Sequence, residues 1–342
     1  MGRRIAVLGA GANGASVGAD LTMAGEDVVL IEQWPEHVEA MRAHGVRINT
    51  PGDSTVVPVR TLHLCEVATL RHRFDVVLML MKAYDSTWAA HLLEPYLAED
   101  GLLVGVQNGM SVDTIARAVG GHRTLGCVIE ITSMMFEPGV VERHSPYDRS
   151  WFAVGSLDPS THGREDEVAS LLRHVGRVEI VDDIRAAKWM KIVSNATTLV
   201  TSAILDLPLL EAARIPQMRE LMLRSGREAL DATVSLGNPV LPIFGLSKDD
   251  VVDHERVPET LLDALLQGFV LPESKTTILQ DWMKGRRSEV DDINGLVART
   301  HRELGGRAPA NGAVVEVAHR IERGSVVPGP DNLVLLLELE AR

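Results

Sequence analysis

The sequence contains few cysteines and no metal-binding pattern. Its only cysteines in 342 residues are Cys65 and Cys127, which are far apart and form no CxxC pair. Two isolated thiols predict no disulfide framework and indicate a reducing compartment. The twelve histidines fall into no HExxH or comparable ligand spacing, so we expect no bound metal.

Long apolar runs and clusters of basic residues are missing as well. Segments such as "VVLMLM" and "LVLLL" are too short to span a bilayer, and glycines interrupt the apolar part of "MGRRIAVLGAG" at once. We therefore expect a soluble, cytoplasmic protein without a signal peptide. The net charge of −13, without a dense lysine or arginine run, argues against nucleic acid or a membrane as the main partner.

The length and the order of the patterns predict two domains. An apolar fraction of 45% with 24% charged residues is ordinary for a globular chain, and 342 residues exceed the usual size of one domain. Alternating strand and helix patterns fill residues 1–183, which predicts an α/β domain with a doubly wound, mostly parallel sheet. Helical periodicity fills residues 184–342, which predicts an all-α domain.

The first thirty residues carry the most informative motif. An apolar strand at Ile5–Leu8 leads into Gly9, Gly11 and Gly14 in the pattern GxGxxG, followed by a helix and a second strand, "DVVLI", that ends at Glu32. Gly9 permits a tight turn, Gly11 lets a pyrophosphate approach the backbone, and Gly14 allows the helix to pack against the strand. We therefore predict a dinucleotide-binding site.

The same segment bears on the choice of cofactor. Ala12 and Asn13 open the helix, where free N–H groups and the positive end of the helix dipole favour phosphate. Glu32 is placed to accept hydrogen bonds from the adenosine ribose and to repel a 2′-phosphate, which favours NADH over NADPH. A solvated carboxylate is the structural alternative for Glu32, and Arg42 is close enough along the chain to turn toward a phosphate.

Polar residues follow the later strands of the first domain. Lys82 comes after "FDVVLML", Asn108 and Gly109 end "GLLVGVQNG", and Thr132 ends "RTLGCVIEIT". Ligands of open α/β sheets bind at the carboxyl ends of the strands, so all four are candidate cofactor-binding residues. A loop lysine and an ordinary Asn-Gly turn are the alternatives. We further expect "GVVERH" and "SWFAVG" to form an antiparallel pair and "RVEIV" to close the sheet.

The second half combines predicted helices with a long loop. The stretch "GNPVLPIFGLSKDDVVDHERVP" is interrupted by proline and glycine, which predicts a surface loop. The expected helices are Arg185 to Leu205, Pro208 to Leu236, Pro258 to Gln267, Thr277 to Gly285, Val290 to Leu304 and Asn311 to Arg323.

Lys191 and Asn195 lie four residues apart in the apolar helix segment "KWMKIVSN", and therefore on one helix face. A snorkelling lysine with a solvated head is one interpretation of Lys191, and a proton donor aimed into a pocket is the other. Further along, Thr277 is typical of a helix-capping residue, and Glu289 can pair with the arginines of "KGRR". Neither of these two would be selected on its pattern alone.

Five motifs in this order make the chain resemble the ketopantoate reductase (2-dehydropantoate 2-reductase) family. They are the N-terminal GxGxxG, "KAY" at 82–84, "QNG" at 107–109, "KxxxN" at 191–195 and "TTILQD…GRRSEVDDINGL". The resemblance covers nearly the whole chain. It implies a Rossmann domain and a helical domain like that of 6-phosphogluconate dehydrogenase, with catalysis in the cleft between them, on the route to pantothenate.

The resemblance also implies roles for individual residues. Lys191 would be the general acid, and Glu289 a catalytic carboxylate that contacts the substrate hydroxyl and the cofactor. Asn195 would orient the substrate, with Thr277 at the place of a substrate-binding serine. Lys82 and Asn108 would contact the cofactor near the reacting centre.

Three departures from the family pattern bear on substrate and cofactor. Leu199 stands where the family often has a second asparagine, which predicts a substrate-binding position suited to an apolar group. Glu32 and Gln33 occupy the place of a basic phosphate anchor. The loop between residues 237 and 258 is longer than the family needs.

The leading hypothesis is an NAD(P)H-dependent reduction of a 2-oxo acid to a 2-hydroxy acid, either ketopantoate or a close relative. A 3-hydroxy acid dehydrogenase that works oxidatively is one alternative, and a non-catalytic dinucleotide-binding protein is another. The expected partner is the small-molecule substrate, and a homodimer is a candidate assembly.

Overall fold

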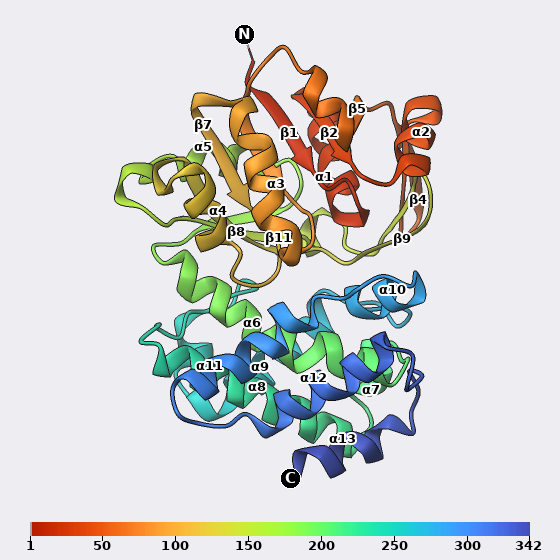
Figure 1. Cartoon of the computed structure of the whole chain (residues 1–342), viewed down its shortest axis with the longest axis vertical. Coiled ribbons are helices and arrows are strands. Elements are labelled where there is room, and N and C mark those ends of the chain that lie inside the picture. The colour runs from red at the N-terminus through yellow and green to blue at the C-terminus, as the bar shows by residue number, and fades with distance from the viewer. Residues whose placement is uncertain (1) are drawn as a thin grey trace. The chain divides into compact units, whose positions relative to one another are not determined.

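The computed structural model describes residues 2–342 and divides into two compact units (Figure 1). The first unit ends at Arg185 and the second spans Ala186–Arg342. The domain boundary expected at 183/184 lies two residues before this division. No helix within the described residues is both long enough and apolar enough to cross a membrane.

The first unit is built on an eight-stranded sheet in the order β12-β11-β8-β7-β6-β1-β2-β5. The strands are β1 (Arg4–Leu8), β2 (Asp27–Glu32), β5 (Thr61–His63), β6 (Phe74–Met79), β7 (Leu97–Gly105), β8 (Thr124–Glu130), β11 (Trp151–Ser156) and β12 (Arg177–Ile180). From β5 to β8 all neighbours are parallel, and β11 runs antiparallel to β8. The strand order reverses between β1 and β6, which is where ligands bind in open sheets of this kind.

Helices cover both faces of this sheet, as the side-chain alternation along β1 shows. Ile5 and Val7 pack into one apolar cluster with residues of α1 (Ala12–Met23) and α5 (Glu165–Leu172), while α2 (Pro35–His44) contributes Met41. Ala6 and Leu8 point the other way, into a cluster with α3 (Ser86–Leu93) and α4 (Val112–Val119). Because both faces are buried, the strands are apolar at nearly every position. The doubly wound α/β fold is confirmed.

A second, four-stranded sheet corrects one of the predicted pairings. Its order is β4-β3-β10-β9, formed by β3 (Val46–Thr50), β4 (Asp53–Val57), β9 (Ser133–Glu137) and β10 (Val140–Arg143). The expected pairing of "GVVERH" with "SWFAVG" is wrong. β10 turns back on β9 after Gly139, whose φ of +79° suits the reversal, and also pairs parallel with β3. The "SWFAVG" strand, β11, pairs instead with β8, and β12 forms the edge of the main sheet as expected.

The second unit is helical, and its described residues, 186–342, contain no β-strand. Its helices are α6 (Ile184–Ile204), α7 (Leu209–Ala212), α8 (Pro216–Ser235), α9 (Val257–Gly268), α10 (Thr277–Met283), α11 (Asn294–Glu303), α12 (Pro309–Glu322) and α13 (Asn332–Glu340). The single helix expected over Pro208 to Leu236 is two helices, because Pro216 lacks an N–H and starts a new one. α13 was not predicted.

Buried polar side chains fasten α6 to its neighbours. The Asn294 side-chain amide at the start of α11 donates to the Ala196 carbonyl at 3.1 Å and to Asn311 Oδ1 at 2.9 Å. Ser225 of α8 also donates to the Ala196 carbonyl, at 3.0 Å. A Cβ atom at Gly226 would lie 2.3 Å from Thr197 Oγ1, so α8 approaches α6 as closely as only glycine allows. These contacts fix α6 among three other helices.

Candidate active site

Two glycines close the turn between β1 and α1. Gly9 has a φ of +89°, and a Cβ atom there would lie 2.7 Å from the Met81 backbone nitrogen. A Cβ atom at Gly14 would lie 2.0 Å from the Gly9 carbonyl oxygen, so a larger residue would push α1 off the turn. The Gly9 N–H donates to the Ile31 carbonyl at 2.9 Å and fastens the turn to β2. The turn thus lies at the strand-order reversal between β1 and β6.

The start of α1 fits the pyrophosphate of a dinucleotide. Gly11 provides no side-chain cap, the first turn contains no acidic residue, and a Cβ atom at Gly11 would meet nothing within 4 Å. The open space lies beside N–H groups at the positive end of the helix, which favours a phosphate. Asn13 Oδ1 is buried without a hydrogen-bond partner, so a ligand hydroxyl would satisfy it. Gly11, Ala12 and Asn13 are therefore the residues that would hold the dinucleotide here.

Glu32 lies at the carboxyl end of β2 and is buried. Its Oε1 atom accepts hydrogen bonds from the backbone N–H groups of Gln33 at 2.8 Å and Trp34 at 3.0 Å. These bonds hold the carboxylate in place at the strand end, unlike a solvated surface side chain.

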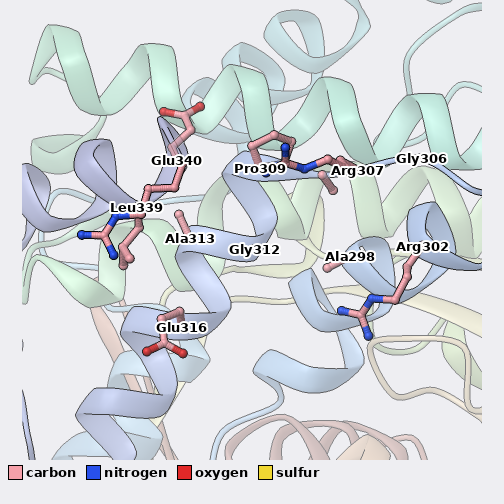
Figure 2. Close-up of a pocket in the computed structure, with 12 residues that line it drawn as sticks. Ala298, Arg302, Gly306, Arg307, Pro309, Gly312, Ala313, Glu316, Leu339 and Glu340 are labelled. Carbon is pink, nitrogen blue, oxygen red and sulfur yellow. The ribbon is translucent and has the colours of Figure 1, made fainter.

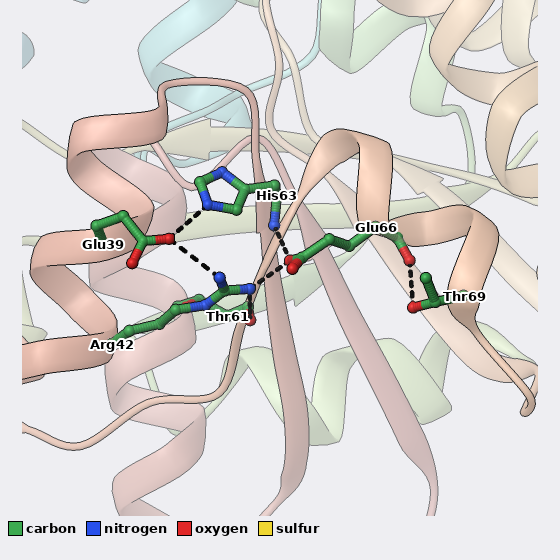
Figure 3. A network of polar contacts seen from close by, with 6 residues as sticks. All are labelled: Glu39, Arg42, Thr61, His63, Glu66 and Thr69. Atoms are coloured by element: carbon green, nitrogen blue, oxygen red, sulfur yellow. Dashed lines mark hydrogen bonds and ion pairs between the residues drawn. The ribbon is translucent and has the colours of Figure 1, made fainter.

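Arg42, the alternative phosphate contact, is engaged by two carboxylates (Figure 3). Its guanidinium donates to Glu39 at 3.1 Å, to Glu66, and to the Thr61 carbonyl at 3.2 Å. The hydrogen bond to Glu66 raises the pKa of Arg42 and lowers the pKa of Glu66. Glu66 also accepts from the His63 N–H at 2.8 Å. Arg42 would have to leave these partners to reach a phosphate.

His37, which the sequence patterns did not single out, supports the glycine turn. Its side chain is fully buried, and its Nε2 atom lies 2.9 Å from the Ala10 carbonyl oxygen, inside the GxGxxG motif. The Gly139 N–H donates to His37 Nδ1 at 2.8 Å. Because Nδ1 accepts, Nε2 must be the donor, so this pattern requires the neutral ring. His37 thereby ties the glycine turn to the second sheet.

Lys82, Asn108, Gly109 and Thr132 follow the carboxyl ends of three neighbouring strands, β6, β7 and β8. Lys82 precedes the short helix η2 (Ala83–Asp85), and Gly109 has a φ of +76°. The Thr132 N–H donates to Ser145 Oγ at 2.9 Å. These four positions share one edge of the sheet with the glycine turn.

Gln107 forms hydrogen bonds that connect two loops at this edge of the sheet. The only sequence pattern that includes it is the "QNG" motif. Its side-chain amide donates to Ser86 Oγ at 3.0 Å, and its Oε1 accepts from Ser111 Oγ at 2.9 Å. Ser86 Oγ in turn donates to the Ala83 carbonyl at 2.7 Å. The chain of hydrogen bonds links the loop after β7 to the loop after β6, so Lys82 and Asn108 lie on connected segments.

In the helical unit, α6 places Lys191, Asn195 and Leu199 on one face, at successive turns. Lys191 is 8% exposed and Asn195 is 2% exposed, whereas Leu199 is half-buried. The Lys191 ammonium lies 4.8 Å from the centre of the Phe244 ring. A lysine whose head is solvated does not fit these observations.

Phe244 comes from the long loop between α8 and α9. Its φ of +64° is in the left-handed region, which costs a non-glycine residue about 1–2 kcal/mol. Its ring packs on Phe269 with centroids 5.3 Å apart at an interplanar angle of 47°. Both side chains are buried. The loop that was expected at the surface therefore places the aromatic side chain of Phe244 next to Lys191, the predicted proton donor.

The start of α10 is anchored to α6 through Thr276, not Thr277. Thr276 Oγ1 donates to the Leu199 carbonyl at 2.9 Å and accepts from the Leu279 N–H. Thr276 is thus the helix cap, and the capping role considered for Thr277 is wrong. Thr277 is the first residue of α10 and is half-buried. The bond to Leu199 brings the α10 start to the α6 face that bears Lys191.

Glu289 is buried at the start of a short helix, η9 (Val290–Asp292), between two anchored neighbours. Ser288 donates its N–H and its hydroxyl to Glu322 Oε1, at 2.9 and 2.6 Å. Asn294 is bonded to the Ala196 carbonyl of α6. Burial raises the pKa of Asp292, and the neighbouring Glu289 carboxylate raises it further. Glu289 thus lies between two segments that hydrogen bonds tie to α12 and α6.

A hollow of about 410 Å³ lies elsewhere in the helical unit (Figure 2). It is lined from the end of α11, the start of α12 and the end of α13, and includes none of the residues predicted as site residues. The Ala310 and Asn311 N–H groups at the start of α12 already donate to Glu228, at 2.8 and 2.9 Å. Among residues 2–342, no group of three or more His, Cys, Asp or Glu side chains could hold a metal ion.

Two family models match the chain. Residues 5–157 match the model "Ketopantoate reductase PanE/ApbA", and residues 183–322 match "Ketopantoate reductase PanE/ApbA C terminal". The chain is 25% identical to a 2-dehydropantoate 2-reductase of Archaeoglobus fulgidus, over 94% of this chain and 99% of the relative. It is 26% identical to the enzyme of that name from Mesorhizobium japonicum, with the same coverage.

Solved structures share the fold over its full length. The PanE/ApbA family ketopantoate reductase from Ralstonia eutropha is 27% identical with a TM-score of 0.78, covering 94% of this chain and 99% of that one. A ternary structure of D-mandelate dehydrogenase with NADH and anilino(oxo)acetate has a TM-score of 0.82 at 20% identity and the same coverage.

The His37 contacts generate a prediction for dinucleotide binding. His37→Phe keeps an aromatic ring but leaves the Ala10 carbonyl and the Gly139 N–H without their partner, which should loosen the glycine turn. We expect the Kd of NADH, measured by fluorescence titration, to rise about tenfold. His44→Phe, at an exposed position of the same helix, is the matched control. Unchanged NADH binding in a folded His37→Phe protein would contradict this role.

Proposed function

The chain belongs to the ketopantoate reductase family of oxidoreductases acting on CH–OH groups, and we propose that it reduces a 2-oxo acid to the 2-hydroxy acid with NADH. The observation that carries this proposal is the buried ammonium of Lys191, followed one turn later by the Asn195 carboxamide. Relatives along the full length are named 2-dehydropantoate 2-reductases, which supports ketopantoate or a close analogue as the substrate.

The proposed chemistry divides between cofactor and protein. When bound, the nicotinamide cofactor supplies the hydride that the carbonyl carbon receives. Lys191 donates the proton that the carbonyl oxygen takes up, and its positive charge polarises the C=O bond beforehand. The Asn195 amide donates a hydrogen bond to the same oxygen or to the substrate carboxylate. Glu289, buried at the start of η9, accepts a hydrogen bond from a substrate hydroxyl.

Two features of the first unit support NADH over NADPH. The Glu32 carboxylate is fixed at the end of β2, where the adenosine ribose binds in this fold. Arg42 is held by Glu39 and Glu66 and would have to give up both to meet a 2′-phosphate. The D-mandelate dehydrogenase structure shows that a protein of this fold binds NADH.

We expect a lower KM for NADH than for NADPH because the Glu32 charge repels the 2′-phosphate, by a discrimination of roughly a hundredfold. Glu32→Gln is the sharp test, since it keeps an acceptor oxygen for the Gln33 and Trp34 N–H groups and removes the charge. In steady-state kinetics, the difference between the KM values for NADPH and NADH should be smaller in this variant than in the wild type. Equal or better use of NADPH by the wild type would rule the preference out.

The proton-donor role of Lys191 predicts a kinetic effect on the chemical step. Lys191→Met retains the apolar stem without the ammonium, so kcat should fall about a hundredfold or more while the Kd of NADH stays unchanged. Lys248→Met, at an exposed position in the short helix η7 (Lys248–Val251), is the control. A Lys191→Met protein with most of the wild-type kcat would refute the assignment.

Leu199 predicts the kind of substrate side chain. A substrate hydroxyl facing its isobutyl group loses a hydrogen bond worth about 1 kcal/mol, whereas an apolar arm gains roughly 1–3 kcal/mol from burial. We expect kcat/KM to be higher for 2-oxo acids with apolar branches than for ketopantoate, and Leu199→Asn to shift the preference toward ketopantoate. If the wild type prefers ketopantoate to every apolar analogue, this role of Leu199 is wrong.

A further inference from the structure

The long loop between α8 and α9 places one aromatic side chain, that of Phe244, next to Lys191. Phe244 is buried although it is preceded and followed by proline- and glycine-containing loop sequence, and both Phe244 and Gly245 have positive φ angles, +64° and +77°. Left-handed backbone at a bulky residue persists only where the surrounding contacts impose it. The imposed conformation points the ring at an ammonium 4.8 Å from its centre.

We propose that Phe244 is a positioning residue for the reduction: its ring holds the Lys191 ammonium in the place from which the proton is donated. This inference rests on the proposed function of Lys191. The ring face carries partial negative charge and attracts a cation at this distance, most strongly where water is excluded. Phe269, with its ring 5.3 Å away, supports Phe244 from the segment that ends α9.

The lysine side chain itself explains why such a restraint is needed. Its four-carbon stem has several rotatable bonds, so an unrestrained ammonium samples positions from which proton donation fails. The observed rate is proportional to the fraction of molecules in the competent arrangement. A neighbour that favours one ammonium position therefore raises kcat without binding the substrate. A purely structural Phe244 would instead act only through folding stability.

The test compares substitutions that separate the ring face from apolar packing. Phe244→Leu keeps an apolar side chain without the β-branching that the left-handed backbone disfavours, and Phe244→Tyr keeps the ring face. Phe269→Leu removes the supporting ring as a packing control. For each folded variant, kcat, KM for a 2-oxo acid, KM for NADH and Tm are measured, with Lys191→Met as the reference.

We expect Phe244→Leu to lower kcat by about 2- to 30-fold, the equivalent of a cation–π contact of about 0.5–2 kcal/mol. KM for NADH should not change, Phe244→Tyr should restore most of kcat, and Phe269→Leu should lower Tm with a smaller loss of kcat. If Phe244→Leu does not fold, Phe244→Met provides the same comparison.

Three outcomes overturn the inference. If Lys191→Met loses activity but Phe244→Leu keeps the wild-type kcat, Phe244 has no positioning role and the proposed function stands. If Phe244→Leu and Phe244→Tyr lower kcat equally, or if Phe269→Leu lowers kcat as much as Phe244→Leu does, the loss of kcat comes from altered packing and not from the loss of the ring face. If Lys191→Met keeps the wild-type kcat, the proposed function fails first, and this inference fails with it.

Discussion

The burial of α6 is the constraint on which the helical unit depends. Residues 186–198 of this helix are buried without interruption, although they include a lysine and an asparagine of the predicted site. A helix buried on all sides must satisfy its polar groups internally or through its neighbours. The Thr197 and Thr198 hydroxyls do so by donating to carbonyls one turn earlier, both at 2.8 Å. The contacts from Ser225 and Asn294 then lock the helix against α8 and α11. The cost of burying an ammonium in such a place is the observation on which the proposed role of Lys191 rests.

Most of the fold could be predicted because its signals are local. The strand, glycines and helix of residues 4–23 follow each other directly, and β2 is fixed by an apolar run that ends in Glu32. Pairing partners are not local. The run "GVVERH" has the periodicity of a strand, but its sequence does not indicate whether it pairs with β11 or with β3. The predicted pairing with β11 was wrong. The break between α7 and α8 was missed for a different reason. The apolar periodicity continues through Pro216, whereas the helical backbone cannot continue through a proline.

The same holds for the candidate site: residues with a local sequence pattern were predicted, and residues that matter through distant contacts were not. Lys191 and Asn195 were proposed because their spacing is helical, Glu32 because it ends a strand, and Leu199 because the resembling family often has an asparagine at that position. The helix start at Thr277 was predicted correctly, but the capping role considered as its alternative belongs to Thr276, and only the bond to the Leu199 carbonyl distinguishes the two adjacent threonines. Neither His37 nor Phe244 has a signal in its own segment. His37 contacts a turn formed by earlier residues, and Phe244 contacts a lysine of α6, from which α7 and α8 separate it along the chain.

We propose that this chain reduces the carbonyl carbon of a 2-oxo acid. The most direct measurement follows the hydrogen that is transferred, with NADH deuterated at either face of the nicotinamide C4 and mass spectrometry of the product. We expect a 2-hydroxy acid that carries one deuterium at C2 with one of the two labelled cofactors and none with the other. Loss of NADH without label in a 2-hydroxy acid, or no turnover of any 2-oxo acid across a panel of ketopantoate and bulkier analogues, would contradict it.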